Sequence, residues 1–354
     1  MASTYLQRTQ SGTETDSKKA TISVWVKIGS SHVGNFNAGL FGTHVSGNYG
    51  ADGNTQIGFY NGGLYAWFKT GGSTYFKQES TRRFEDHNGW YHLVYRFDTT
   101  QAAGGDRIRI YCNGEEITSF DTSSGPPQNT NIEMNNGGRI VRVGTMNFTG
   151  GTHNYFDGVM SHFHFCDGYS YGPTEFGETD NTTGAWKIKA TPNVTYGTNG
   201  FFILKDGNSV TDQSSNTNNL VVSGGTLTKT EDNPSNIFAT WNPSWSQSNG
   251  NIGDITFSHG NLTTISAVSY RTTPTTLGMS STGKYYWEIK RNETGSDTHF
   301  GVMSENATPA NTATWIGNAA NGWVIAGDNG QVYTGGTGGS TLSGGAIGNG
   351  EIFM

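Results

Sequence analysis

The sequence carries little charge and contains no long apolar segment. Of its 354 residues, 14% are charged and 33% are hydrophobic, and no apolar run is long enough to cross a bilayer as a helix. Residues 1–21 also lack a basic region followed by an apolar core. We therefore expect no membrane insertion and no Sec-type secretion, and a chain that is made in the cytosol.

Cationic residues are scarce as well. The 21 Lys and Arg are outnumbered by 28 Asp and Glu, which gives a net charge of −7, and no local Lys/Arg cluster offsets this balance. Proteins that bind nucleic acid need a basic surface facing the phosphates. No nucleic-acid partner is therefore expected.

Only two cysteines occur, Cys112 and Cys166, and each lies in a predicted strand. Because disulfides are rare in the cytosol, two reduced and buried thiols are favoured over a disulfide.

Glycine is abundant instead, with 52 residues, and Thr, Ser, Asn and aromatic residues are frequent. Long helices need Ala, Leu, Glu and Lys, whereas this mixture favours short strands joined by tight turns. The composition predicts an all-β protein.

The clearest local pattern is a three-strand meander. Residues 90–98 and 107–112 alternate bulky and polar side chains around a Gly-Gly loop, as two half-buried strands do. Asn113-Gly114 suits a type I′ turn because both positions of that turn need a positive φ. Residues 115–120 are predicted to return as the third strand.

Further short strands are predicted on either side of this meander. Residues 21–28 place Ile22, Val24 and Val26 on one apolar face. The remaining strands are expected at residues 3–9, 40–43, 55–60, 64–69, 139–143 and 156–166. About ten short strands fit a two-sheet sandwich or jelly roll.

The order of three motifs resembles a known family. The motifs are W-x-H at Trp90–His92, Y-x-N-G at Tyr111–Gly114 and F-D-G-x-M at Phe156–Met160. In this order they resemble the laminin-G-like, concanavalin-A-like jelly roll. The resemblance implies an antiparallel jelly-roll sandwich over residues 1–180.

A change in composition follows this region. Residues 181–250 hold scattered Pro, Gly, Asn and Ser with isolated large aromatics, which indicates an ordered connector laid against a domain. The amino-acid sequence of residues 176–189, 196–204 and 212–220 resembles a segment of structural proteins of marine bacteriophages. That resemblance implies a virion protein.

Residues 251–354 form a second pattern. G-K-Y-Y-W-E-I at 283–289 predicts a strand over Lys284–Lys290, and with H-F-G-V at 299–302 it resembles the opening of a SPRY domain. The resemblance implies an incomplete SPRY-like β-sandwich. Because the sequence ends inside an apolar strand at residues 351–354, we expect either a longer native chain or completion by another chain.

No catalytic pair of carboxylates is evident. Glycosidases of sandwich fold place two carboxylates about 5 to 9 Å apart on one strand face, which requires i, i+2 or i, i+4 spacing. Glu115 and Glu116 are adjacent and so point to opposite faces. No nucleophile triad, P-loop or dinucleotide motif is present either, and no enzymatic activity is expected.

Two metal sites are conceivable from the residue types. His162, His164 and Cys166 alternate along one strand face, a spacing that suits zinc, although a sheet face at a partly wet surface or subunit contact is the favoured explanation. Laminin-G-like domains often hold calcium at the sandwich edge, and the candidates for it are Asp52, Asn54 and Asp157. These residues also serve turns, and no other cofactor is expected.

Exposed aromatic side chains are the candidates for binding sugar rings. Core packing accounts for most aromatics in such a chain. The residues expected near hairpin tips are Tyr60, Tyr65, Trp67 and Tyr75 in the first domain, and Trp315 and Trp323 in the second.

Together these features predict a non-enzymatic phage virion protein, a tail fibre or receptor-binding appendage that contacts host-surface glycans. It would be made in the host bacterial cytoplasm and assemble with other virion proteins. We expect a homo-oligomer, and by analogy a trimer. Two alternatives stay open: a capsid decoration or cement protein, because no N-terminal attachment segment is evident, and a glycan-degrading enzyme of the same fold.

Overall fold

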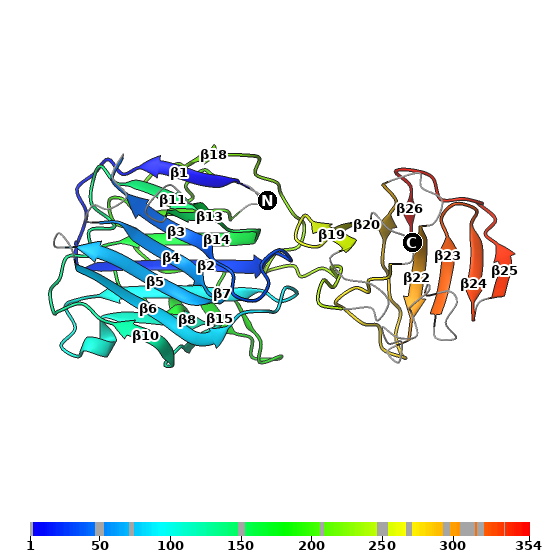
Figure 1. Cartoon of the computed structure of the whole chain (residues 1–354), viewed down its shortest axis with the longest axis horizontal. Helices are drawn as coiled ribbons and strands as arrows, with labels where there is room; N and C mark the ends of the chain where they lie inside the picture. Colours follow the sequence, from blue (N-terminus) through cyan, green and yellow to red (C-terminus); the bar gives the residue numbers. More distant parts are fainter. Residues whose placement is uncertain are drawn as a thin grey trace. The chain divides into compact units, whose positions relative to one another are not determined.

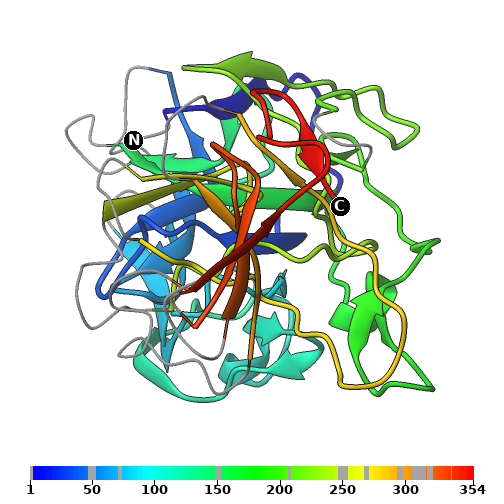
Figure 2. The same ribbon diagram turned by 90° about the vertical axis from the view of Figure 1, so that its right-hand side faces the viewer.

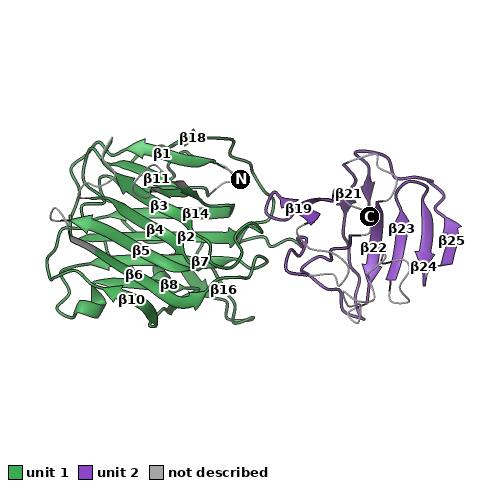
Figure 3. Ribbon diagram, in the orientation of Figure 1, with its two compact units in different colours: residues 1–238 green, residues 239–354 purple. Residues whose placement is uncertain are grey.

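The computed structural model describes residues 3–46, 53–70, 74–147, 153–205, 209–245, 254–266, 271–292, 298–304, 316, 322–335 and 337–354. It contains strands and two short 3-10 helices, η1 (Gly104–Asp106) and η2 (Pro173–Glu175), in these residues. The chain divides into two compact units, residues 1–238 and 239–354 (Figure 3). The all-β prediction is confirmed. No helix in the described part of the chain is long and apolar enough to span a bilayer.

The larger sheet of the first unit has eight antiparallel strands (Figure 1). Its order is β10 (Phe120–Ser124), β6 (Thr74–Arg83), β5 (Gly63–Thr70), β4 (Thr55–Tyr60), β3 (Ala38–His44), β11 (Ile140–Val143), β1 (Tyr5–Thr9) and β18 (Val221–Ser223).

The second sheet of this unit has six antiparallel strands. Its order is β17 (Phe201–Ile203), β14 (Gly158–Asp167), β2 (Lys19–Ile28), β7 (Tyr91–Asp98), β8 (Ile108–Cys112) and β9 (Glu115–Glu116). Two hairpins add β12 (Thr145–Asn147) with β13 (His153–Tyr155), and β15 (Gly177–Thr179) with β16 (Trp186–Ile188).

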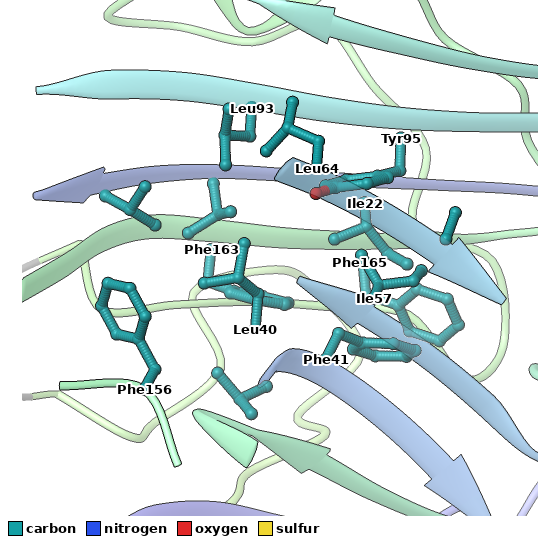
Figure 4. Close-up of a cluster of buried hydrophobic side chains, with 14 of the residues drawn as sticks. Ile22, Leu40, Phe41, Ile57, Leu64, Leu93, Tyr95, Phe156, Phe163 and Phe165 are labelled. Atoms are coloured by element: carbon teal, nitrogen blue, oxygen red, sulfur yellow. The ribbon is translucent and has the colours of Figure 1, made fainter. Parts of the chain in front are cut away.

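The apolar core lies between the two sheets, and Figure 4 shows part of it. Strand alternation supplies it: Ile22 comes from β2 and Ile57 from β4, and both side chains are fully buried. Phe41 of β3 packs against Phe165 of β14, with ring centroids 5.1 Å apart. Aromatic pairs of this kind favour one fixed arrangement of the two sheets.

The predicted meander forms, with one difference. Asn113 and Gly114 have φ values of 50° and 86°, as a type I′ turn requires. The third strand, however, is β9, which holds only two residues. Phe120 instead begins β10 and pairs with β6 in the larger sheet, where it packs against the core.

Residues 181–238 of the predicted connector belong to the first compact unit. Their aromatic and acidic side chains contact the outer face of the six-stranded sheet. Trp186 stacks near His92 with ring centroids 5.9 Å apart, and Asp232 lies 3.0 Å from the ammonium of Lys27.

The second unit consists of small antiparallel sheets, and Figure 2 draws the strands of the largest of them in orange to red. The largest has the order β22 (His299–Met303), β23 (Gly322–Ala326), β24 (Gln331–Thr334) and β25 (Thr337–Thr341). Two further pairs are β19 (Ile255–Ser258) with β20 (Thr263–Ser266), and β21 (Ile289–Lys290) with β26 (Ile352–Phe353).

The strand predicted over residues 284–290 is much shorter than expected. Only β21 is extended and paired, through Ile289 with Phe353. Tyr285 and Tyr286 are exposed and lie outside any described strand. Period-two alternation alone does not make a strand when no neighbouring strand supplies the hydrogen bonds. The likeness of this unit to a SPRY domain stays a prediction.

Candidate functional site

Strand β5 places two predicted aromatic residues on the outer face of the larger sheet. Leu64, Ala66 and Phe68 point into the core and are at most 1% exposed. Because side chains alternate along a strand, Tyr65 and Trp67 point the other way. Tyr65 is buried, whereas Trp67 is half-buried and reachable from solvent.

The register brings a third predicted aromatic residue beside them. Gly58 of β4 lies opposite Tyr65, so Tyr60 is the diagonal neighbour of Tyr65. The two tyrosine rings lie 5.1 Å apart with an angle of 31° between their planes.

Polar side chains from the flanking strands complete this surface. Trp67 lies between Gln56 of β4 and Lys77 of β6, while Glu79 of β6 is opposite Tyr65. The Oε1 of Glu79 accepts a hydrogen bond from Asn61 Nδ2 at 3.4 Å. We call this surface the aromatic face; it consists of Gln56, Tyr60, Tyr65, Trp67, Lys77 and Glu79.

The hairpin of β12 and β13 lies directly on the outer face of β3, next to the aromatic face. This close approach requires glycine in β3, since a Cβ at Gly39 would sit 2.0 Å from the backbone nitrogen of Met146. The hairpin therefore bounds the aromatic face on the β3 side.

The other aromatic candidates do not join this surface in the described part of the chain. The side chain of Tyr75, on β6, and the whole of Trp315 lie outside the described residues. Trp323 belongs to the second unit, where it is 53% exposed on β23 between Val302 and Thr334. It is a separate exposed aromatic residue.

The calcium candidates are not brought together. Asp52 lies outside the described residues. Asn54 is buried just before the first residue of β4, whereas Phe156, which precedes Asp157, stacks at 6.4 Å on Phe59 near the last residue of that strand. Six residues of strand span about 20 Å. Asn54 and Asp157 therefore lie at opposite ends of β4, too far apart to share one ion.

Asp157 has protein partners of its own. Its carboxylate accepts a hydrogen bond from Ser31 Oγ at 2.5 Å, and its backbone N–H donates to His32 Nε2 at 2.8 Å. Among the described residues, no group of three His, Cys, Asp or Glu side chains is arranged to hold a metal.

A β-bulge separates the histidines of the zinc hypothesis. Ser161 and His164 of β14 pair with Trp25 and Ser23 of β2, so β14 carries one extra residue between them. His162 takes a φ of 48° within this bulge. The even spacing on which the hypothesis depended is therefore interrupted.

His164 is buried rather than at a wet surface. Its ring stacks on Phe202 at 3.9 Å, and its Nδ1 lies 2.8 Å from the hydroxyl of Tyr196. Burial, reinforced by the neighbouring histidines, holds the pKa of His164 well below its ordinary value.

The sequence did not identify the polar groups on the outer face of the six-stranded sheet. Ser23 Oγ lies 2.8 Å from His92 Nε2, and Trp186 Nε1 donates to His92 Nδ1 at 2.9 Å. Burial lowers the pKa of His92 to about 3, which keeps the ring neutral. The isolated aromatic residues of the connector were the one signal in the sequence for this cover.

A second buried group lies on the same face. The ammonium of Lys27 and the indole Nε1 of Trp90 both donate to Asp232 Oδ2, at 3.0 and 3.2 Å. Lys27 is 2% exposed and Asp232 is fully buried. The connector thus covers this part of the sheet. We call the outer face of the six-stranded sheet around Trp25, Lys27, His92 and His164 the covered face.

Comparison with known proteins bears on the first unit. The family model Laminin_G_3, described as the concanavalin A-like lectin/glucanases superfamily, matches residues 2–169. A comparison with curated proteins finds no match.

Among solved structures, the chain is similar to a heptameric SAP-like pentraxin from Limulus polyphemus, with 16% identity, a TM-score of 0.37, and coverage of 64% of this chain and 90% of the pentraxin. It is also similar to a candidate carbohydrate-binding protein from Bacteroides ovatus, with 17% identity, a TM-score of 0.35, and coverage of 64% and 59%. A third similar structure is the CBM40 module of a Ruminococcus gnavus IT-sialidase bound to α2,3-sialyllactose, with 13% identity, a TM-score of 0.29, and coverage of 43% and 86%. The family match and the two-sheet architecture together establish that the first unit has a concanavalin A-like lectin fold.

Proposed function

We propose that the first unit binds carbohydrate through the aromatic face. The observation that carries this proposal is the position of Trp67, half-buried, next to Tyr65 along β5 and between Gln56 and Lys77 across the sheet. An indole offers a flat apolar surface for the apolar side of a sugar ring. The ammonium of Lys77 beside it can hydrogen-bond ring hydroxyls and fix the orientation of the sugar.

The covered face supports this choice of surface. Its polar groups already have partners within the chain, as in the contact of Lys27 with Asp232 and that of His92 with Trp186. These groups are also closed off from solvent, since Lys27 is 2% exposed and His92 is fully buried. The aromatic face has half-buried aromatic and cationic side chains that solvent reaches.

The biological setting we propose is a bacteriophage virion. It is supported by the resemblance of residues 176–189, 196–204 and 212–220 to structural proteins of marine phages. The protein would be a tail fibre or receptor-binding appendage, made in the bacterial cytoplasm and assembled with other virion proteins. Binding at each site would be weak, and several copies in one assembly would strengthen it. By analogy with other phage fibres, we expect that assembly to be a trimer.

We also propose that binding occurs without catalysis. A glycosidase needs two carboxylates about 5 to 9 Å apart facing one sugar. The aromatic face, as defined above, contains a single carboxylate, that of Glu79. Release of reducing sugar from host polysaccharide by the purified protein would contradict this part of the proposal.

The direct test is a glycan array probed with the full chain and with Trp67→Ala. We expect the wild-type protein to give reproducible hits that Trp67→Ala lowers at least tenfold, since loss of a stacked aromatic removes roughly 1.4 kcal/mol or more of binding free energy. Trp323→Ala is the matched control because Trp323 lies in the second unit. Hits that survive Trp67→Ala and disappear in Trp323→Ala would place binding in the second unit instead.

The virion assignment has its own test. Antibodies against the first unit should label purified virions of the source phage at one position, and the position separates a tail appendage from a capsid decoration. Absence of the protein from purified virions would overturn both structural roles.

A further inference from the structure

The charged side chains of the aromatic face are not evenly distributed around Trp67. Their positions indicate which chemical class of sugar the face would bind. Lys77 lies directly opposite Trp67, so the Cβ atoms of the two residues are about 5 Å apart. Lys69 follows Trp67 by two residues on β5 and therefore shares its face. The one carboxylate, Glu79, lies a row further along β6, opposite Tyr65. The row that contains the reachable indole is thus cationic.

The ammonium of Lys77 is not neutralised by a salt bridge to any carboxylate of the described residues. Two other basic side chains of the unit differ in this respect, since Lys27 pairs with Asp232 and Arg139 with Glu133. The chain as a whole is acidic, with a net charge of −7. This surface therefore places a half-buried cation, with no salt bridge to a described carboxylate, beside a half-buried indole.

Glu79 does not cancel this cation. Residues i and i+2 on a strand are about 6.5 Å apart, so the two groups belong to different rows. The carboxylate of Glu79 is directed to Asn61, whose Nδ2 donates to it at 3.4 Å. Only 6% of Glu79 is exposed. The reachable charge of this face is therefore the ammonium of Lys77, while Glu79 is buried beside Asn61.

We propose that the aromatic face selects an anionic saccharide, one that bears a carboxylate or a sulfate ester. The sugar ring stacks on Trp67, and the anionic substituent contacts the ammonium of Lys77. A charge-assisted hydrogen bond to the substituent is stronger than one between neutral groups. This inference rests on the proposed function and adds the chemical class of the ligand.

The test is an array in which each neutral oligosaccharide is printed beside its sialylated and its sulfated derivative. We expect the anionic members to bind roughly tenfold more strongly than their neutral parents, the factor typical of one hydrogen bond to a charged group. Signal on sialylated members alone assigns a carboxylate, signal on sulfated members alone assigns a sulfate, and signal on both assigns charge as the determinant. Neutral members that bind as well as their derivatives would overturn the inference.

Variants of Lys77 make the test specific. Lys77→Gln should reduce anionic hits to the level of the neutral parent and leave that parent unchanged, whereas Lys77→Arg should retain most of the preference. Lys229→Gln is the matched control, since Lys229 is 58% exposed and belongs to the connector segment that includes Asp232. Anionic hits that are insensitive to Lys77→Gln would contradict the assignment of this residue.

Salt and a second variant separate failure of this inference from failure of the proposed function. Raising NaCl from 50 to 500 mM should weaken binding of anionic members and spare neutral ones, because salt screens the contact to a partly exposed ammonium. Glu79→Gln should leave the preference for anionic members intact. Neutral hits that depend on Trp67 would keep the proposed function and remove this inference, whereas an array without any hit would contradict both.

Discussion

The two outer faces of the first unit follow the same strand alternation but differ in how far their side chains are exposed to solvent. In both sheets the alternate residues of each strand leave the core, and in both they include aromatic and charged side chains. On the covered face Lys27 is 2% exposed and His92 is fully buried. On the aromatic face Trp67 and Lys77 remain half-buried.

The difference comes from the later part of the chain. Asp232 and Trp186 reach the covered face from positions 205 residues after Lys27 and 94 residues after His92 in the sequence. Once covered, polar groups must be paired internally, because an unpaired buried charge or hydrogen-bonding group costs several kcal/mol. We infer that the covered face contributes to stability and that the aromatic face is available for binding.

The largest expected effect is that of Asp232→Ala. The substitution removes the carboxylate that lies 3.0 Å from the buried ammonium of Lys27. Breaking a buried pair in this way costs roughly 3 to 5 kcal/mol of unfolding free energy, which urea denaturation of the full chain would measure. Glu231→Ala is the matched control, since Glu231 is 69% exposed and should change stability by about 0.5 kcal/mol or less. Equal losses in the two variants would contradict a covered face held by this pair.

Acid should destabilise the covered face through its histidines. The pKa of His92 is about 3 in the folded chain and roughly 6.5 when unfolded. Because the unfolded state binds the proton more readily, this contribution is complete above about pH 6.5 and is lost as the pH falls toward 3. The slope from His92 is up to roughly 1.4 kcal/mol per pH unit, and His164 acts in the same direction.

Urea unfolding at pH 7, 6, 5 and 4 would measure this slope. His92→Phe should flatten it, whatever its effect on stability at pH 7, while His259→Phe should not, because His259 is exposed and lies in the second unit. If His92→Phe left the pH dependence of the unfolding free energy unchanged, the assignment of this dependence to His92 would be contradicted.

A smaller effect is expected from Gly114→Ala. Gly114 has a φ of 86°, and a Cβ there would lie 2.7 Å from the indole ring of Trp186. The variant should therefore lose about 1 to 2 kcal/mol, from backbone strain together with displacement of the connector. Gly105→Ala, in the loop between β7 and β8, meets nothing within 4 Å and serves as the control. Identical urea midpoints for the two variants would show that the contact with Trp186 contributes nothing.

The smallest stability effect is expected on the aromatic face. Trp67→Ala should cost about 1 kcal/mol or less, because the indole is only half-buried, and yet it should abolish most glycan binding. Trp186→Ala should do the reverse, since it removes the hydrogen bond to His92 Nδ1 and leaves Trp67 in place. Parallel measurements of unfolding and array binding test the pair. If both variants lost binding and stability together, the division of labour between the two faces would be wrong.

Much of the first unit could be predicted from local patterns. Tyr65 and Trp67 share a face because they lie two residues apart on one strand, and the positive φ at Asn113 and Gly114 follows from the preference of these residue types. Predictions failed where pairing with distant strands decides the outcome. Phe120 joins the other sheet, and residues 284–288 lack a neighbouring strand in the described part of the chain.

The residues of the candidate site also fall into those that local patterns predicted and those that only strand pairing revealed. The sequence identified Tyr60, Tyr65 and Trp67 as aromatic candidates, but it did not indicate Lys77 or Gln56, because these become neighbours of Trp67 only through the register of β4, β5 and β6. It also could not reveal that one extra residue at Ser161–His164 interrupts the spacing of the histidines. Register and bulges depend on how whole strands fit across a sheet.

The sequence by itself determined that this chain forms strands, where the Asn113-Gly114 turn lies, and which side chains of a strand share a face, since these follow from period-two alternation and from the φ preferences of single residues. The tertiary structure alone decided which outer face remains open. That choice depends on contacts such as those of Lys27 with Asp232 and of His92 with Trp186, and no local pattern specifies contacts between residues so far apart in the chain.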